Sequence, residues 1–150
     1  TINPNDIKKV IKAKMKNPNH VICGYDKIHK YEDSSSINLP KVVVNEKQEL
    51  IYISRSLVPG FKKKIKNLEY LKQVCIYAFN KKDLNKFYSK NKKGKLEKIE
   101  DIEILRFFDL NIKIKMVRLH SNSVAVDEVE DVKKAERLIK NKAILSVKKK

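Results

Sequence analysis

The chain has 150 residues, of which 41% are hydrophobic, and it contains 3 Gly and 4 Pro. This composition excludes a disordered or fibrous protein and fits one globular domain over residues 1–150. The 35 Lys and Arg against 18 Asp and Glu leave a net charge of +17, which would suit a polyanionic partner. However, the lysines are spread over the whole length, without a nucleic-acid-binding motif or alternating aromatic residues. A basic nucleic-acid-binding module is therefore kept only as an alternative, and nucleic acid is not the favoured partner.

The cysteines and the apolar runs indicate the cellular compartment. Cys23 and Cys75 each lie in an apolar, strand-like run, where a free thiol behaves as a small hydrophobic side chain. The sequence shows no signal peptide and no apolar run of membrane-spanning length. We therefore expect a cytoplasmic protein with reduced thiols and no membrane partner. The chain begins TINPNDIKKV, without Met and almost directly in a helix signal, as a start inside a domain would give.

The first forty residues predict a helix, a strand and a long loop. Asn3 or Asn5 can cap the helix, which should end before residue 17. Its apolar residues are spaced as one buried stripe, namely Ile7, Val10, Ile11 and Met15. Residues 20–25 then read as a strand, and residues 26–40 as a loop of a length usually reserved for function or mobility.

Residues 41–44 and 49–55 predict a β-hairpin, because two β-branched or aromatic runs flank a polar turn. Pro59 stops the second strand, so Arg55 should lie near a strand end with its guanidinium free to leave the sheet. Two interpretations of Arg55 stay open at this point, a solvated surface charge and a site residue.

The middle of the chain predicts a buried strand between helical segments. Residues 68–71 read as a short helical turn, and the run QVCIYAF at 73–79 is almost wholly apolar. Such a run is typical of a strand that is buried on both faces. Residues 81–89 follow as an amphipathic helix with Leu84, Phe87 and Tyr88 on its apolar side.

One continuous helix is predicted from residue 96 to 109. Five of its positions fall on one stripe, and a carboxylate and a guanidinium interrupt that line: Leu96, Ile99, Glu103, Arg106 and Leu110. A charge on such a stripe is costly unless it is paired or serves a ligand. An internal ion pair between Glu103 and Arg106 and a role in a site are equally good explanations.

The last third of the chain predicts a strand at 112–119 and a helix that ends near Lys140. Between them, a short apolar run ends at Asp127, and Glu130 follows three residues later as in a capping box. Asp127 can therefore be simply a helix N-cap. It can also be a metal or ligand residue, because open α/β sheets bind ligands at the carboxyl ends of their strands.

Strands that are separated by helical segments predict an α/β sheet with at least some parallel pairing. The sequence contains no Gly-rich phosphate loop, no nucleophile with an adjacent base, and no Cys and His cluster with metal-ligand spacing. General motifs therefore leave the activity open.

Four stretches in order carry a resemblance to a known family: VVVNEKQELIYISRSLVP, QVCIYAF, LEKIEDIEILR and AVDEVEDVKKAE. Together they resemble the carboxyl-terminal part of the 3-deoxy-manno-octulosonate cytidylyltransferase family, also called CMP-Kdo synthetases. The resemblance covers nearly all of the chain. It implies a Rossmann-like nucleotidyltransferase fold of the nucleotide-diphospho-sugar transferase type, with a mixed sheet and flanking helices.

The resemblance also implies a reaction and its residues. Members of this family are Mg²⁺-dependent homodimers that join CTP to an eight-carbon 2-keto acid sugar, release pyrophosphate and supply lipopolysaccharide synthesis. Carried over by motif, Asp127 would be a catalytic metal ligand. Four further positions would bind substrate, namely Arg55, Gln73, Tyr77 and Glu103.

Three positions depart from the family pattern: Gln73 replaces a histidine, Cys75 a strand glycine and Ile104 a glutamine. The family's glycine-rich CTP loop and first metal aspartate would lie upstream of Thr1, so the amino-terminal nucleotide-binding half is not in this sequence. We therefore expect the 150-residue chain alone to be inactive. A synthetase for a sialic-acid-like nine-carbon sugar is the enzymatic alternative.

Overall fold

The computed structural model describes residues 2–63, 65–66, 68–120, 129, 131–133, 135–137 and 139–140. Its elements in chain order are α1 (Pro4–Lys16), β1 (Val21–Lys27), β2 (Lys41–Val44), β3 (Leu50–Ser54), β4 (Leu71–Ala78), α2 (Lys81–Ser89), α3 (Lys95–Glu100), the 3-10 helix η1 (Glu103–Leu105), α4 (Arg106–Asp109) and β5 (Ile114–Arg118). No described helix is both long and apolar enough to cross a bilayer.

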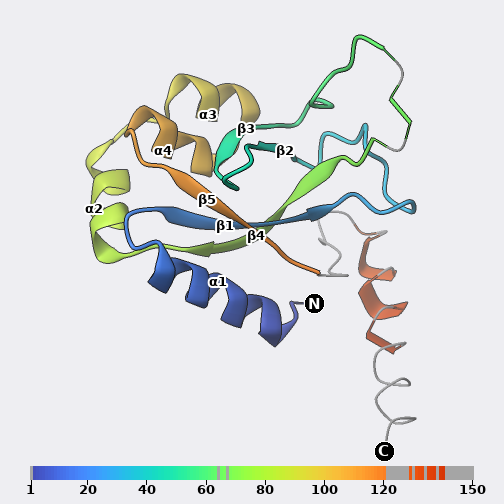
Figure 1. The fold of residues 1–150 in the computed structure, drawn as a ribbon, viewed down its shortest axis with the longest axis horizontal. Helices are drawn as coiled ribbons and strands as arrows, with labels where there is room; N and C mark the ends of the chain where they lie inside the picture. The colour runs from blue at the N-terminus through green and yellow to red at the C-terminus, as the bar shows by residue number, and fades with distance from the viewer. Residues whose placement is uncertain are drawn as a thin grey trace, which may run out of the picture.

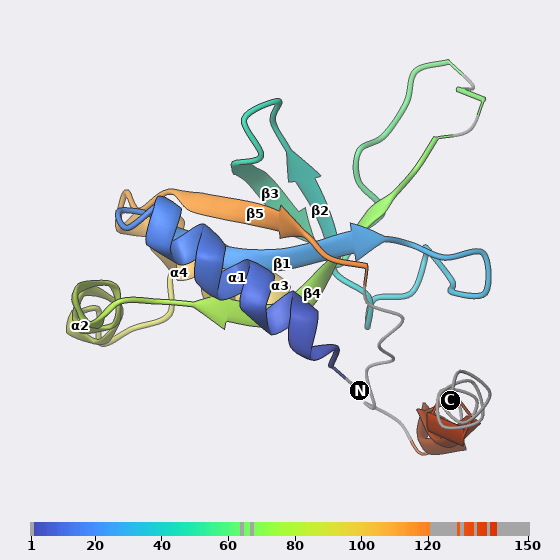
Figure 2. The ribbon, with the colours of Figure 1, turned by 60° about the horizontal axis from the view of Figure 1, so that its bottom comes forward.

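The five strands form one mixed sheet in the order β3-β2-β4-β1-β5. β1 pairs with β5 in parallel and with β4 antiparallel, which confirms the predicted mixed α/β sheet. α1 covers one face of this sheet, while α3 and α4 lie on the other (Figures 1 and 2). The hairpin of β2 and β3 and the helix α2 also lie where the sequence predicts them.

Alternation along β1 supplies a hydrophobic core on each face of the sheet, because successive side chains of a strand point to opposite sides. Val21 and Cys23 belong to the larger core, with Phe107 from α4. Ile22, between them, belongs to the smaller core under α1, with Val10. The thiol of Cys23 is thus buried as expected, whereas Cys75 is exposed.

α1 begins as predicted, but it packs through a different face. The Asn3 side chain caps it by accepting a hydrogen bond from the backbone N–H of Asn5 at 3.0 Å. Of the predicted stripe only Val10 is buried, and Met15 is 77% exposed. The buried face instead joins Val10 to Asp6, one turn earlier. Hydrophobic periodicity predicted the wrong face because it assigns only apolar residues to the buried side, whereas Asp6 is a buried carboxylate.

β4 corrects two expectations. Residues 68–71 form no helical turn, because 68–70 are irregular and Leu71 already begins the strand. The strand is not buried on both faces, since Cys75 is exposed. Its pairing with β1 shifts by two residues at this point, where Cys23 faces Tyr77 and the next residue, Gly24, faces Val74. Such a bulge re-aims the side chains around it.

The helix predicted from 96 to 109 is broken at Asp101. This residue has a φ of 50° and a ψ of 51°, in the left-handed region, and it separates α3 from η1 and α4. Asp is one of the few residue types that tolerate this conformation. The break resets the helical phase, so the stripe that joined Glu103 to Arg106 in the sequence does not exist in the fold.

Candidate functional site

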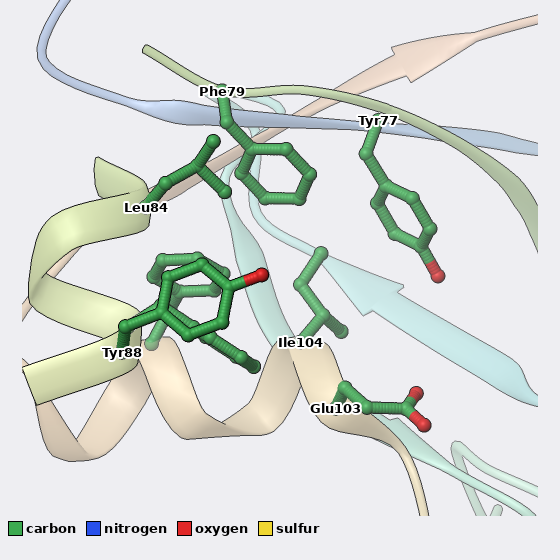
Figure 3. A pocket seen from close by; sticks show the side chains of 8 residues that line it. Tyr77, Phe79, Leu84, Tyr88, Glu103 and Ile104 are labelled. Carbon is green, nitrogen blue, oxygen red and sulfur yellow. The ribbon is translucent and has the colours of Figure 1, made fainter. Parts of the chain in front are cut away.

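A pocket with a volume of about 170 Å³ lies between β4, α2 and the η1–α4 segment (Figure 3). Most of its lining is apolar or aromatic. The lining residues are Tyr77, Phe79, Leu84, Phe87, Tyr88, Glu103, Ile104 and Phe107. Two of the residues predicted to bind substrate, Tyr77 and Glu103, thus come together from segments 26 residues apart in the sequence.

α2 forms one wall of the pocket, and its start is fixed by a capping box. Asn80 accepts a hydrogen bond from the backbone N–H of Asp83 at 2.7 Å, and Asp83 accepts one from the backbone N–H of Asn80 at 3.1 Å. Lys14 of α1 donates to the same Asp83 carboxylate at 2.6 Å. These contacts hold α2 so that Leu84 and Tyr88, one turn apart, face the pocket.

Tyr77 and Glu103 supply polar groups on one side of the pocket (Figure 3). The Tyr77 hydroxyl accepts a hydrogen bond from Gln73 Nε2 at 2.7 Å. Burial, followed by the nearby Cys23, Cys75 and Glu103, raises the pKa of Tyr77, so the phenol stays neutral and keeps its proton. Gln73 therefore reaches the site through Tyr77 and does not line the pocket itself.

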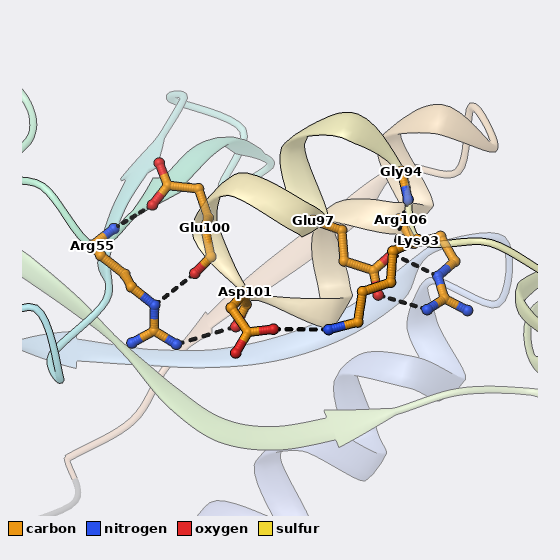
Figure 4. A network of polar contacts seen from close by, with 7 residues as sticks. All are labelled: Arg55, Lys93, Gly94, Glu97, Glu100, Asp101 and Arg106. Atoms are coloured by element: carbon orange, nitrogen blue, oxygen red, sulfur yellow. Dashed lines mark hydrogen bonds and ion pairs between the residues drawn. The ribbon is translucent and has the colours of Figure 1, made fainter.

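Of the two explanations left open by the sequence, the ion pair between Glu103 and Arg106 does not form. Arg106 instead binds both carboxylate oxygens of Glu97, at 2.7 Å from Nε and 2.5 Å from Nη2 (Figure 4). These bonds lower the pKa of Glu97, which is buried and also accepts from the backbone N–H of Gly94. Among the described residues, none forms a hydrogen bond or ion pair with the Glu103 carboxylate. This carboxylate is consequently available to a ligand.

Arg106 also contacts the aromatic wall of the pocket, by which we mean the side chains of Leu84, Phe87 and Tyr88 on α2. The central carbon of its guanidinium lies 3.9 Å from the centre of the Phe87 ring, in a cation–π contact. Phe87 in turn packs against Phe107, with ring centres 5.3 Å apart. The Glu97–Arg106 pair thereby ties α3 and α4 to the side of α2 that lines the pocket.

Arg55 is not free to leave the sheet, contrary to the prediction. Its guanidinium donates to the backbone carbonyls of Glu100 at 2.6 Å and Asp101 at 3.1 Å (Figure 4). It also donates to the backbone carbonyl of Ile37 at 2.9 Å. A cation at the carboxyl end of α3 is also favoured by the helix dipole. Arg55 does not line the pocket, and its assignment as a substrate-binding residue stays a prediction.

Glu100 completes the junction of α3 with the sheet. Its carboxylate accepts hydrogen bonds from the backbone N–H of Arg55 at 2.8 Å and from the hydroxyls of Ser54 at 2.7 Å and Tyr52 at 3.1 Å. Burial opposes the ionisation of Glu100, but these three bonds outweigh it and lower the pKa of the carboxyl group. This network explains the local fold and leaves the pocket as the better candidate for ligand binding.

Asp127, for which the sequence predicts an N-cap role or a metal role, lies outside the described residues. In the part of the chain that the structure describes, no group of three or more His, Cys, Asp or Glu side chains is placed to hold a metal ion. Magnesium and its ligand therefore stay predictions from the resemblance.

Sequence reasoning missed the aromatic wall as part of the site. Leu84, Phe87 and Tyr88 were recognised as the apolar side of a helix, with no sign that they face a cavity and not the core. Hydrophobic spacing gives no signal for this, because it does not distinguish a residue that packs in the core from Tyr88, which is 73% exposed in the fold. An exposed aromatic side chain that lines the same pocket as the carboxylate of Glu103 is typical of a binding surface.

The lining can bind a ligand but offers no covalent chemistry. A carboxylate, two phenols and apolar walls recognise hydroxyl groups and the faces of a carbon skeleton. None of the eight lining residues is a cation, and none is a nucleophile beside a base. The arrangement thus fits a substrate-positioning site.

The fold is similar to that of a solved structure of CMP:2-keto-3-deoxy-manno-octonic acid synthetase complexed with CTP. The TM-score is 0.82 with 27% sequence identity, over 94% of this chain and 58% of that one. The fold is therefore that of the Rossmann-like nucleotidyltransferases.

The sequence comparisons give the family. The family described as cytidylyltransferase matches residues 1–114, and the chain belongs to this family. The 3-deoxy-manno-octulosonate cytidylyltransferase of Flavobacterium johnsoniae is 30% identical over 138 residues, which are 90% of this chain and 56% of the relative. The mitochondrial one of Arabidopsis thaliana is 32% identical over 143 residues, 94% of this chain and 49% of the relative. The chain thus spans about half the length of the curated relatives it matches.

Proposed function

We propose that the protein carrying this chain is a cytidylyltransferase that activates a 2-keto-3-deoxy sugar acid of the Kdo type. The anomeric hydroxyl of the sugar attacks the α-phosphorus of CTP, pyrophosphate leaves, and a CMP-sugar for lipopolysaccharide or surface polysaccharide synthesis results. The names of the similar proteins support this reaction, as does the CTP in the similar structure. The observation that carries the proposal is the pocket in which Tyr77 and Glu103 converge.

In this proposal the described residues bind the sugar acid and position it. Glu103 accepts hydrogen bonds from sugar hydroxyls, Tyr77 supplies a phenol, and the aromatic wall of α2 packs against the carbon skeleton. Rate enhancement in such a reaction comes mainly from positioning and from neutralisation of phosphate charge. A bound Mg²⁺ would supply part of that neutralisation, with Asp127 as one ligand.

We also propose a homodimer, because the family that the chain resembles is usually dimeric. A cytoplasmic location is proposed from the sequence, which shows no signal peptide and no apolar run of membrane-spanning length. A nine-carbon, sialic-acid-like substrate is the second candidate. The pocket volume of about 170 Å³ alone does not distinguish the two sugars, because the pocket is open at the polar side, where Glu103 is exposed.

The deciding experiment measures pyrophosphate release and CMP-sugar formation by the full-length protein, with CTP and either Kdo or a nine-carbon keto acid. We expect Kdo to be preferred in kcat/KM. A preference of about tenfold or more for the nine-carbon acid, a difference of about 1.4 kcal/mol in transition-state binding, would replace the Kdo assignment. The 150-residue chain is the matched control and should stay at background.

A salt titration tests the basic binding module. If the charge of +17 is only solvated lysine, binding to DNA or RNA should be indifferent to sequence and nearly absent at physiological salt. Tight, sequence-selective binding under those conditions would favour the module over the enzyme.

A further inference from the structure

Gln73 lies behind the pocket and not in it. The side chain is buried, with the residue only 8% exposed, and it is absent from the pocket lining. Its Nε2 donates to the hydroxyl of Tyr77 at 2.7 Å. The two residues are four positions apart on β4, and the bulge at Cys75 lies between them. The irregular strand thus brings the phenol within reach of the amide.

The thiol of Cys23 fixes which way the Gln73 amide points. Cys23 Sγ donates its proton to the backbone carbonyl of Gly24 at 3.4 Å, so it can act only as an acceptor toward other groups. Gln73 Nε2 lies 3.8 Å from this sulfur. If the Gln73 amide were flipped, its oxygen would face the Cys23 sulfur, whose proton is already donated to Gly24, so neither atom could donate a hydrogen bond. The network therefore selects the orientation in which the NH₂ group faces both Cys23 and Tyr77.

This orientation determines what Tyr77 can offer a ligand. A phenol has one proton, and because the Tyr77 oxygen accepts from Gln73, its own proton is left for another acceptor, for which the neighbouring Cys75 sulfur and a ligand in the pocket compete. Resting on the proposed function, we propose that Gln73 is a positioning residue that holds Tyr77 as a hydrogen-bond donor toward the sugar acid without touching the substrate.

The pocket then has two polar groups of opposite kinds. Glu103, as a carboxylate, can only accept, so it suits the hydroxyl groups of the sugar. Tyr77 donates, so it suits an atom that can only accept, such as an oxygen of the substrate carboxylate. A sugar acid carries both kinds of group, and this pairing would select one of its two possible orientations in the pocket.

A double-mutant cycle in the full-length protein tests the inference through the KM for the sugar acid. Gln73→Leu should raise KM about tenfold with little change in kcat, the effect of losing one oriented hydrogen bond. Gln73→Glu should raise KM at least as much, because a carboxylate would accept a hydrogen bond from the Tyr77 hydroxyl and so turn the phenol proton away from the pocket. Gln73→His can still donate and should stay within about twofold of the unsubstituted protein. In a Tyr77→Phe background, Gln73→Leu should raise KM no further.

A second glutamine–tyrosine pair provides the matched control. Tyr25 donates to Gln48 outside the pocket, so Gln48→Leu should leave KM unchanged. Thermal melts check that every variant is folded. An equal rise in KM for Gln73→Leu with and without Tyr77 would show that Gln73 acts independently of Tyr77 and would overturn the inference. If the unsubstituted protein makes no CMP-sugar, the proposed function fails and the inference falls with it.

Discussion

Glu97 and Arg106 meet across the break at Asp101, with two guanidinium nitrogens 2.5 and 2.7 Å from the two carboxylate oxygens. The Glu97 side chain is fully buried and that of Arg106 is 14% exposed. Because Arg106 also lies over Phe87, this pair connects the broken helix to the wall of the pocket. The charges of Glu97 and Arg106 therefore stabilise the walls of the pocket, whereas the carboxylate of Glu103 is available to bind a ligand.

Removal of the buried charge from this pair should destabilise the fold. Glu97→Gln leaves a guanidinium without its bidentate partner, and we expect unfolding to become easier by about 3 kcal/mol. Urea denaturation checks this value. Glu69→Gln is the control, because Glu69 and Arg118 form an exposed pair whose loss should cost about 1 kcal/mol or less. Equal losses for the two variants would contradict the structural role.

Stability should also fall in acid. Hydrogen bonds from Arg106 hold the pKa of Glu97 below its ordinary value of 4.5, and a group with a lowered folded pKa stabilises the fold when it is ionised. The contribution is complete above the unfolded value and is lost as the pH falls through the folded one. Urea midpoints measured from pH 7 to pH 3 should decline below about pH 4.5. The decline should be shallower in Glu97→Gln, and identical slopes would refute the assignment.

Glu103 should matter for substrate and not for stability. Glu103→Ala removes an exposed carboxylate that makes no hydrogen bond or ion pair among the described residues, so the urea midpoint should be unchanged. The KM for the sugar acid should rise about tenfold or more, since hydrogen bonds to a charged group are worth about 1.5–3 kcal/mol. Glu46→Ala, an exposed glutamate in the hairpin turn, is the control and should leave KM as it is. A normal KM in Glu103→Ala would remove this residue from the site.

Asp127 can be tested by separating its two predicted roles in the full-length protein. Asn caps helices about as well as Asp, so Asp127→Asn should keep stability while it weakens Mg²⁺ dependence and lowers activity by orders of magnitude. Asp127→Ala should lose about 1 kcal/mol of stability as well. Activity across a magnesium titration, together with thermal melts, separates the two effects. Near-normal activity of Asp127→Asn would show that Asp127 acts only as a helix N-cap and does not bind the metal.

The parts of the fold that the sequence predicted are those that depend on neighbours along the chain. The helix α2 follows from its capping residues and the spacing of Leu84, Phe87 and Tyr88, and the hairpin of β2 and β3 from two β-branched runs around a polar turn. The break at Asp101 escaped prediction because one residue in the left-handed region leaves no mark on hydrophobic periodicity.

In the candidate site, too, some residues could be predicted from the sequence, whereas contacts between distant segments could not. Tyr77 and Glu103 were found through the resemblance, and the fold brings them to one pocket. The partners of Arg55 and Arg106 could not be found in this way. Arg55 binds carbonyls of Glu100 and Asp101, which are 45 and 46 residues away, and carbonyls carry no sequence signal. Long-range contacts of this kind are decided only by the folded arrangement.

The register shift in β4 limits how this strand can change in evolution. Because the shift between Cys23–Tyr77 and Gly24–Val74 is even, the side chains after it keep the same faces as in a regular strand. Loss of one residue at Cys75 or Ile76 would turn Tyr77 and everything after it to the opposite face of the sheet. Loss of both would restore a continuous ladder with correct faces but with a phenol and an amide only two positions apart. Insertions and deletions that occur in pairs are therefore the ones that this strand can accept.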